Sequence, residues 1–507
     1  MSDLHDETDL RVELTRVVGE LSEARLENRY LREKIQRLLQ ERFGAKSEEL
    51  DRAQLLLMLG GVDPGKSSEP VAAEAPRRSK DPSPPRKRRL RTPEDLPIVE
   101  EVIVPEPVKA CPEAWREIGE EVTVLLDFEP ARFFKRRIVR PKYARRDHPY
   151  APPIVAPLQT LQDRCVAAPG LVAAVVVGKY CDHLPLYRQE HIFASRHKVH
   201  LPRQTMAQWM ALAADWLKPI YEHMRKEVLA SGYVQIDETP IEYLSPGHGE
   251  TKLGYLWTCA RPGGDTIFQW ETSRAAKCLD AILPAEWTGV VQCDGYAAYP
   301  AFARQRDRQN PITLAGCWAH ARRAVFQAQP SAPRTCAWLL NQIGQLYGIE
   351  RALRTSRAGP VLREAVRSWQ SAPILRRIHA ALGKLRHRYL PQSGMGKAIA
   401  YILEQWPALQ RFVTNGRIEI DNNGVENAIR PTAIGKKNWL FVGAANAGER
   451  GAILYTLVES CRRRGIDPLA YLRDVLTRLP RMTNRQIPEV TPAAWAAAQR
   501  PQHSRAA

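Results

Sequence analysis

The sequence lacks the patterns that mark membrane, secreted and disulfide-stabilised proteins. Its longest apolar runs, at 171–177 and 55–59, fall far short of the roughly 20 residues that a membrane helix needs. The N-terminal stretch MSDLHDETDL is acidic and polar, unlike a secretory signal peptide. The nine cysteines are odd in number and contain no Cys-x-x-Cys pair, which argues against a disulfide framework and a cysteine-cluster zinc site. We therefore expect a cytoplasmic protein.

What the chain has in excess is positive charge. Its 507 residues include 74 Lys and Arg against 56 Asp and Glu, a formal charge of +18. Such a surplus favours a polyanionic partner, of which nucleic acid is the commonest, although a merely soluble basic protein has the same composition. The length suggests roughly three or four folded units, and the 44% hydrophobic content is enough to build cores.

The N-terminal segment, residues 8–50, has the heptad pattern of a coiled coil. Apolar residues alternate at spacings of four and three, and Asn28 at one of the inner positions is a known device for fixing register. A lone amphipathic helix docked on the body is the alternative. The residues at the inner positions are Leu10, Leu14, Val17, Leu21, Ala24, Asn28, Leu31, Ile35 and Leu38.

Two less regular segments follow. Residues 61–96 are rich in Gly, Pro, Ser and charge, and they include the basic run PRRSKDPSPPRKRRLR. This composition predicts a disordered linker, which serves as a phosphate-gripping arm, a solvated spacer or both. The short strand-like runs in residues 97–155 predict a small folded unit. In it Lys135, Arg136 and Arg137 interleave with aromatic residues, a mix that suits a nucleic-acid groove or a basic strand with aromatics in its core.

Residues 160–228 have helical apolar spacing. The joint at 200–204, with Thr205 as an N-cap, is compatible with a helix-turn-helix, although generic helix packing explains the pattern as well. This helical region would precede the larger α/β part of the chain.

From residue 229 the pattern changes to short strands. YVQIDETP, GYLWTCA, DTIFQWE, TGVVQCD and ITLAGC read as strands, with helical stretches after the third, fourth and fifth, including one at 273–283. The order β-β-β-α-β-α-β-α predicts a mixed α/β sheet over 229–329. Residues 330–415 read as a helical insertion. The last part, 416–480, reads as helices broken at Pro431 and near Gly465, and we expect a disordered tail over 485–507.

Two carboxylates occupy similar places in the predicted sheet. Asp237 is placed at the end of the first strand and Asp294 at the end of the fourth. If these strands pair in parallel, both side chains emerge at one sheet edge. Two carboxylates there repel each other unless a cation lies between them, so the pair favours Mg²⁺ or Mn²⁺.

A third candidate acid is Glu426, in the segment DNNGVENAIRP. Asp421 to Asn423 are good helix-capping residues, and on a helix starting there Asn423, Glu426 and Arg430 share one face. Taken alone, any one of these acids is most simply a surface residue. Three such carboxylates together can hold two metal ions that activate a nucleophile and stabilise the leaving oxygen of a phosphodiester.

QIDETP, CDGYAAY, CWAHARR and DNNGVENAIRPTAIGKKNWLF, taken together, resemble the transposases of the insertion sequence 66 family. The resemblance extends upstream through IGEEVTVLLDFEPARF, RPKYA and GKYCDHLPLYRQE, and RFGAKSEEL after the heptads also fits. It implies an α/β fold with a ribonuclease H-like mixed sheet core and a helical insertion, preceded by the helical DNA-binding region and the coiled coil. It also implies that Asp237, Asp294 and Glu426 are the catalytic acids.

The same resemblance suggests further roles. CWAHARR, with His320, Arg322 and Arg323, would line the DNA path, although His320 alone is equally compatible with a hydrogen-bonded core histidine. Lys135, Arg136, Arg137 and Arg430 are further DNA-binding candidates. Family members contain a segment that resembles a small zinc-binding module. Its four expected cysteines fall on Cys111, Ala114, Arg145 and His148 of this chain. Two potential ligands do not make a tetrahedral zinc site, so we expect Mg²⁺, replaceable by Mn²⁺, and no zinc.

The resulting hypothesis is a bacterial, nucleoid-associated DNA transposase that binds element ends, cleaves phosphodiester bonds and transfers strands. Its partners would be the terminal inverted repeats, target DNA, a second copy bound through the coiled coil and accessory proteins of the element. A catalytically decayed DNA-binding regulator and a purely hydrolytic ribonuclease H-like nuclease are the alternatives.

Overall fold

The computed structural model describes residue 19 and residues 133–139, 142–143, 154–155, 160–163, 165–245, 250–306 and 310–499. The predicted coiled coil at 8–50, apart from residue 19, the linker at 61–96 and most of the small unit at 97–155 lie outside these residues. The chain divides into one unit of residues 50–138 and another of residues 1–49 and 139–507. The first contributes the exposed stretch 134–138, and the second holds all of the regular structure discussed below.

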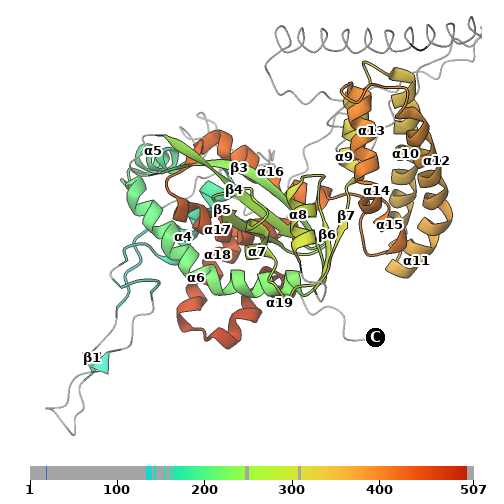
Figure 1. Cartoon of the computed structure of the whole chain (residues 1–507). Coiled ribbons are helices and arrows are strands. Elements are labelled where there is room, and N and C mark those ends of the chain that lie inside the picture. Colours follow the sequence, from blue (N-terminus) through green and yellow to red (C-terminus); the bar gives the residue numbers. More distant parts are fainter. Residues whose placement is uncertain are drawn as a thin grey trace, which may run out of the picture. The chain divides into compact units, whose positions relative to one another are not determined.

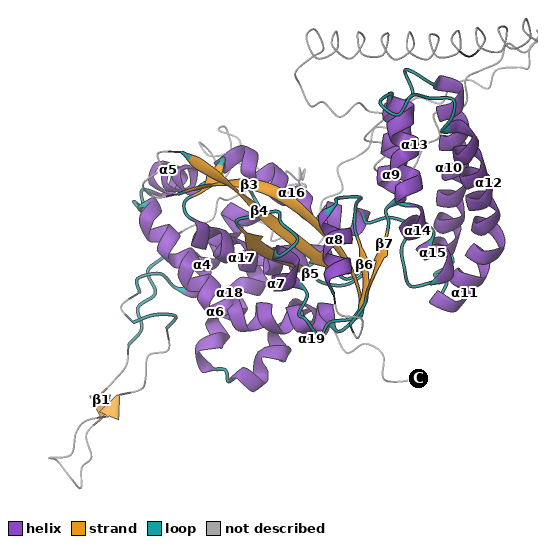
Figure 2. Cartoon of the chain, viewed as in Figure 1, coloured by secondary structure: helices purple, strands orange, loops and turns teal. Residues whose placement is uncertain are grey.

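A mixed sheet forms the centre of the second unit (Figures 1 and 2). Its strands lie in the order β5-β4-β3-β6-β7, with the short β8 also paired to β3. The pairs β3–β4 and β4–β5 are antiparallel, whereas β6 runs parallel to both β3 and β7. The predicted alternation of strands and helices is thereby confirmed. The bounds are β3 Tyr233–Leu244, β4 Thr251–Ala260, β5 Thr266–Glu271, α7 Cys278–Ile282, β6 Gly289–Gln292, α8 Ala298–Gln305, β7 Ile312–Ala315 and β8 Phe441–Val442, and a separate hairpin pairs β1 Lys142–Tyr143 with β2 Ile154–Val155.

Strand β3 divides its residues between two environments. Because side chains alternate along a strand, Val234 and Ile236 point to one face and Tyr233, Gln235 and Asp237 to the other. Val234 and Ile236 belong to a large hydrophobic core built with α6, α17 and α18, while Tyr233 belongs to a second core built from the helical insertion. The central strand is therefore sandwiched between the two cores.

The helices of the first core come from both ends of the described chain. Helices α6 and α17 pack on β5 and on each other, and α4 packs on α18. The N-terminal set is α4 Pro169–Tyr180, α5 Leu186–His197 and α6 Arg203–Leu229, and the C-terminal set is α17 Ala445–Arg463, α18 Pro468–Arg478, η3 Leu479–Arg481, η4 Asn484–Val490 and α19 Pro492–Gln499. The prediction that Thr205 caps a helix is wrong, because α6 starts two residues earlier, after Pro202. Pro202 provides the extended backbone that precedes a helix.

The second core is built by α9 and the helical insertion that follows it. Its helices are α9 Trp318–Gln327, α10 Pro333–Thr355, α11 Pro360–Val366, the π-helical turn η2 Arg367–Ser371, α12 Ala372–Leu385, α13 Gly394–Glu404, α14 Trp406–Leu409 and α15 Arg411–Thr414. Within it the fully buried Arg367 donates to both carboxylate oxygens of the fully buried Glu350, at 2.7 Å each. Arg367 also donates to the carbonyls of Phe412 and Ile418, so the insertion holds the chain segment that returns to the sheet.

Helix α16, Asn423–Trp439, corrects one prediction. It runs through Pro431 without a break, although a proline removes one backbone hydrogen bond. Pro431 is buried, and the helix packs on β3 and β4, so tertiary packing outweighs the missing bond. The predicted break near Gly465 is confirmed, since this glycine has φ 68° between α17 and α18.

The prediction of a disordered tail from residue 485 is wrong up to residue 499. There η4 and α19 are ordered, and the buried Ile487 and Val490 join the first core. Trp495 donates its indole N–H to Asp474 at 3.0 Å. An alanine-rich composition also suits a docked helix, so composition alone does not distinguish a disordered tail from the ordered segment seen here. Residues 500–507 lie outside the described residues.

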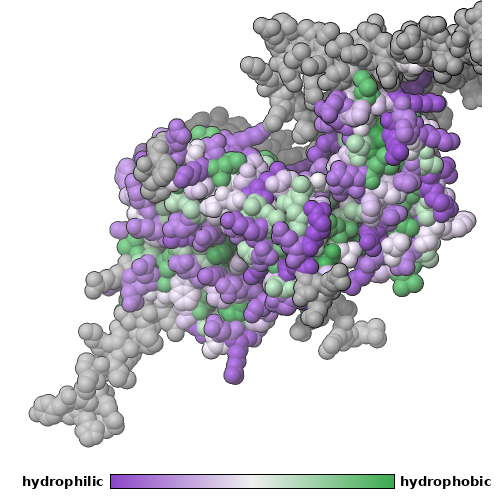
Figure 3. All heavy atoms as spheres, in the orientation of Figure 1, coloured by the Kyte–Doolittle hydropathy of each residue, from purple (hydrophilic) through white to green (hydrophobic). Residues whose placement is uncertain are grey.

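The surface of the described residues is mixed. Hydrophilic residues are spread over the visible face, and apolar residues form separate patches between them (Figure 3). Within the described ranges, no helix combines the length and apolarity that crossing a membrane requires. The eight cysteines in these ranges are free thiols, and six of them are buried.

Candidate active site

Asp237 and Asp294 lie on neighbouring parallel strands. In the register of β3 with β6, Gln235 pairs with Gln292, and each aspartate follows its glutamine by two residues. The predicted parallel pairing is therefore confirmed, and Asp294 follows the end of β6 as expected. Asp237 does not lie at a strand end, because β3 continues to Leu244 through its antiparallel pairing with β4.

The electrostatic environment of Asp237 is unfavourable for its charge. Burial and, to a smaller extent, the nearby carboxylates of Glu238, Glu426 and Asp294 raise the pKa of this carboxyl to about 8. The only lowering contribution among these is the backbone N–H of Glu238, which donates to Oδ1 at 2.9 Å. Asp294 and Glu426 thus both lie close enough to Asp237 to disfavour its charge.

Glu238 is a fourth acid of this cluster that sequence reasoning missed. Its side chain is 1% exposed, and Tyr299 donates to Oε2 at 2.9 Å. Arg274 donates to Oε1 at 2.5 Å, and its guanidinium lies 3.7 Å from the centre of the Tyr296 ring. Burial raises the pKa of Glu238, while Tyr299 and Arg274 lower it. The adjacent acids in the sequence DE were the only available signal.

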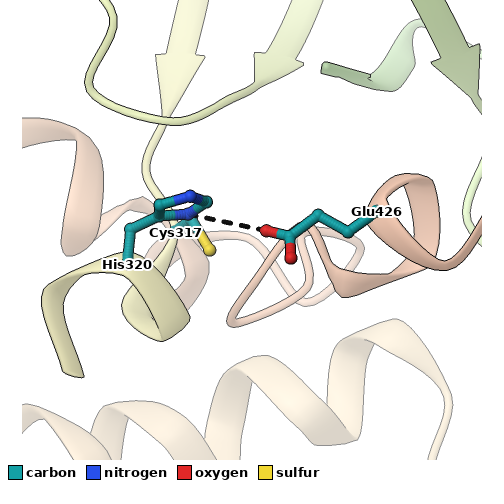
Figure 4. Close-up of side chains that lie close together, drawn as sticks. All are labelled: Cys317, His320 and Glu426. Carbon is teal, nitrogen blue, oxygen red and sulfur yellow. Dashed lines mark ion pairs between the residues drawn. The ribbon is translucent and has the colours of Figure 1, made fainter. Parts of the chain in front are cut away.

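Glu426 enters the site from the first turn of α16. Asn422 is the N-cap residue, and the Asp421 carboxylate accepts from the backbone N–H of Asn423 at 3.2 Å, so this start is stabilised as expected for capping residues. Two side chains of α9 face the Glu426 carboxylate. His320 Nδ1 lies 3.6 Å from Oε1 (Figure 4). Arg323 lies 3.9 Å from Oε2.

A buried amide network connects the two aspartate strands. The Gln235 side chain donates to Oε1 of Gln292 at 2.9 Å and to the carbonyl of Asp421 at 2.9 Å. Gln292 in turn donates to the carbonyls of Gly316 and Glu419, at 3.0 and 2.8 Å. The network therefore fixes both strands against the segment that leads into α16. Two Gln-x-Asp sequences were the signal for it, although nothing in either identifies the partner.

The helical insertion holds the same segment from the other side. Arg363 forms an ion pair with Glu419 at 2.8 Å, and Arg367 donates to the carbonyl of Ile418. The phenol of Tyr233, on β3, accepts from the backbone N–H of Glu419 at 2.9 Å. Residues 418–421 are thus held between the insertion and the sheet, directly before the helix that carries Glu426.

The predicted DNA-binding residues fall in three places. Lys135, Arg136 and Arg137 are exposed and belong to the smaller unit, residues 50–138. Within the larger unit, His320 and Arg323 lie beside Glu426, whereas Arg322 on the same helix is half-buried and lies near Tyr347. Arg430 is exposed on α16.

The positions considered for zinc in the small unit, Cys111, Ala114, Arg145 and His148, lie outside the described residues. Within the described ranges, one group has metal-ligand spacing: single ligand atoms of Cys317, His320 and Glu426 lie within 4.8 Å of one another.

The donor set around Asp237 fits a divalent metal ion. Carboxylate oxygens are the ligands of Mg²⁺ and Mn²⁺, and a cation placed among the acids would reverse the repulsion that raises the pKa of Asp237. Oε1 of Glu426 is buried and has no hydrogen-bond partner, which leaves it available as a ligand.

Comparison with known proteins agrees with the motifs. The model of the family described as "Transposase IS66 family" matches residues 164–450, more than half of the chain. Models of the "IS66 C-terminal element" and the "Transposase C of IS166 homeodomain" match residues 456–493 and 30–101.

Individual relatives carry no functional description of their own. The uncharacterized protein y4jD of Sinorhizobium fredii is 35% identical over 90% of this chain and 92% of its own length. The uncharacterized proteins y4qI and y4hP of the same organism are 36% and 30% identical, over 76% and 91% of this chain and 73% and 88% of their own lengths.

Proposed function

The chain belongs to the IS66 family of transposases, and from this premise we propose that it cleaves phosphodiester bonds at the ends of an insertion element and joins them to target DNA. The observation that carries the proposal is the placement of Asp237 and Asp294 beside each other on parallel strands, with Glu426 close enough to Asp237 to raise its pKa. The strand order β5-β4-β3-β6-β7, with three antiparallel and two further parallel strands, supports assigning the sheet to the ribonuclease H-like class.

Asp237, Asp294 and Glu426 are the residues that would hold Mg²⁺ or Mn²⁺. When bound, the ions supply Lewis-acid activation of a water or 3′-hydroxyl and charge stabilisation at the phosphate. The protein's own contribution is to keep the three carboxylates in place before DNA arrives. The amide network fixes the strands of the two aspartates, and residues 418–421, held by the insertion, fix the start of α16.

Other side chains adjust the charge around these acids. Arg274 and Tyr299 hold the neighbouring Glu238 carboxylate away from solvent. Arg323 on α9 places a half-exposed guanidinium 3.9 Å from Glu426, where it can also meet a phosphate of bound DNA. Arginine is suited to this task because its fork of donors matches phosphate oxygens.

DNA is the proposed partner. The net charge of +18 and the match of residues 30–101 to a homeodomain model support a DNA-binding region separate from the sheet. We further propose that the heptads of residues 8–50 pair two protomers, so that two element ends lie in one complex, and that accessory proteins of the element take part.

A cleavage assay tests the proposal. Labelled DNA carrying the flanking element ends is incubated with the protein and Mn²⁺, beside an Asp294→Asn variant and an Asp280→Asn control on the exposed side of α7. We expect site-specific 3′-end cleavage that Asp294→Asn reduces by at least about 100-fold and Asp280→Asn leaves unchanged.

The other outcomes identify the alternatives. Cleavage without joining to a target molecule indicates a hydrolytic nuclease. Binding of the ends without cleavage, even after the products of neighbouring genes are added, indicates a non-catalytic regulator.

A further inference from the structure

A second metal-ligand set lies beside the proposed catalytic acids. Cys317 is the N-cap residue of α9, His320 lies in the first turn of the same helix, and Glu426 lies in the first turn of α16. One ligand atom from each lies within 4.8 Å of the others, and Figure 4 shows the three side chains converging between the two helix starts.

Two of the three ligand atoms have no hydrogen-bond partner. His320 Nδ1 and Glu426 Oε1 are buried and make no hydrogen bond, and the 3.6 Å between them is too long for one. The adjacent Asn422 is fully buried, and both polar atoms of its side chain are also without a partner. Buried polar groups are normally satisfied, so this concentration of orphan atoms points to a missing ligand.

The Cys317 sulfur lies among groups that a metal ion would also contact. The residue is 1% exposed, and the backbone N–H groups of Asn422 and His320 donate to its sulfur. Burial and the carboxylates of Asp421 and Glu426 nevertheless raise the pKa of this thiol well above its usual range, so a metal ion binds here only by displacing the thiol proton.

The chemistry of the set selects the metal. Thiolate and imidazole ligands suit Zn²⁺, whereas Mg²⁺ prefers oxygen ligands. Tetrahedral zinc bond lengths place ligand atoms about 3.5 Å apart, so closure of the present set needs a shift of about 1 Å. Three protein ligands leave a fourth position open, as in non-structural zinc sites.

We propose that Cys317, His320 and Glu426 form an inhibitory site for Zn²⁺ or a similar soft divalent ion. Zinc engages the Glu426 carboxylate and withdraws it from Asp237 and Asp294, so the two metal sites compete for one side chain. The thiol proton of Cys317 is released to water on binding. This zinc is an inhibitor and not a cofactor, and it is separate from the small unit at 97–155, for which no zinc is expected.

Cobalt provides a direct probe of the site. Co²⁺ takes zinc-like geometry, and a cysteine ligand produces a thiolate-to-cobalt charge-transfer band in the near ultraviolet. The full chain is titrated with Co²⁺ beside Cys317→Ser and, as a matched control, Cys336→Ser, a fully buried cysteine of α10. Because other cysteines can bind cobalt, the measured quantity is the difference between wild type and each variant.

We expect one equivalent of the charge-transfer band in wild type and in Cys336→Ser, and Zn²⁺ should displace the cobalt. Cys317→Ser should lack the band and bind Co²⁺ at least about 100-fold more weakly. Far-ultraviolet circular dichroism establishes that both variants are folded. An identical cobalt spectrum in wild type and folded Cys317→Ser overturns the site.

The inhibitory role rests on the proposed function and is tested separately. In the Mn²⁺-dependent cleavage assay, added Zn²⁺ should inhibit wild type at least about tenfold more strongly than Cys317→Ser. Equal inhibition of the two proteins overturns the inhibitory role. Absence of cleavage under all conditions refutes the proposed function instead, and the cobalt difference spectrum still decides whether the metal site exists.

Discussion

Glu350 in the helical insertion and Asp237 in the sheet are both carboxylates removed from water, but their surroundings differ in sign. Glu350 accepts two hydrogen bonds from the fully buried Arg367 and a further one from Arg363 at 3.3 Å. Asp237 faces three other carboxylates, and its pKa is raised to about 8.

The difference separates a structural ion pair from the proposed metal site. In the insertion, opposite charges satisfy each other and stabilise one arrangement of α10, η2 and the segment before α16. In the sheet, like charges are held together by the fold and carry an electrostatic cost that a cation would remove. The insertion thus stabilises a fold in which the carboxylates around Asp237 stay close together despite their mutual repulsion.

The largest effect should come from removing the cation of the insertion. Arg367→Met leaves Glu350 buried without its main partner and three backbone carbonyls without a donor. We expect the free energy of unfolding to fall by about 3–5 kcal/mol, measured by urea denaturation. The control Arg354→Met, at a half-exposed arginine 3.9 Å from Glu419, should cost less than about 1 kcal/mol. Similar losses for the two variants would show that the buried pair is not special.

The amide network links the two regions and should be the next most sensitive place. Gln292→Met removes the donors to Gly316 and Glu419 and the acceptor of Tyr233 and Gln235. We expect a loss of about 2–4 kcal/mol in stability, together with slower Mn²⁺-dependent cleavage. Gln269→Met, at a half-buried glutamine of β5, serves as the control. Normal cleavage by folded Gln292→Met would refute a positioning role for the network.

Removing the charge of Asp237 and of Glu350 in turn should change the free energy of unfolding in opposite directions. Above pH about 8, in chelator, Asp237 bears a charge that the fold disfavours, so Asp237→Asn should raise the free energy of unfolding by about 1–3 kcal/mol. Glu350→Gln should lower it by a similar amount, because Arg367 loses its counter-ion. Thermal unfolding of both variants under the same conditions measures the two changes. Changes of the same sign would remove the distinction between the regions.

Glu459 on α17 is intermediate between Glu350 and Asp237, because it is buried but has arginines nearby. Its replacement should change the stability least. Burial raises the pKa of Glu459 to about 7 despite the opposing effect of Arg462 and Arg463. Because the folded state holds the proton more tightly than the unfolded state, the stability it contributes is present below pH about 4.5 and is lost as the pH rises to about 7. Glu459→Gln should remove this decline, worth about 1–2 kcal/mol, whereas the exposed Glu449→Gln should leave it. Unfolding free energies across that pH range measure the slope, and an unchanged slope in Glu459→Gln would contradict the assignment.

Local patterns were sufficient for part of the fold. Short strand-like runs from residue 229 onward located the strands, and Asp294 follows its strand as the pattern indicates. Pro431 and the alanine-rich residues 492–499 were misread, because packing against distant elements overrides local preference.

The candidate site was only partly visible from sequence for the same reason. The three acids stand out as motifs, but Gln235 and Gln292 acquire meaning only through bonds to residues 419–421, which are distant in the sequence. Cys317 and His320 likewise gain a third ligand only when α16 is brought beside α9.

Iron-directed cleavage tests the central claim most directly, because it locates a divalent ion without requiring DNA. Fe²⁺ replaces Mg²⁺ at oxygen ligands, and with ascorbate and peroxide it cuts the backbone beside its own site. We expect cuts next to Asp237, Asp294 and Glu426 that excess Mg²⁺ suppresses and Asp294→Asn removes. Cuts at these positions that persist in Asp294→Asn, or cuts confined to other parts of the chain, would contradict it.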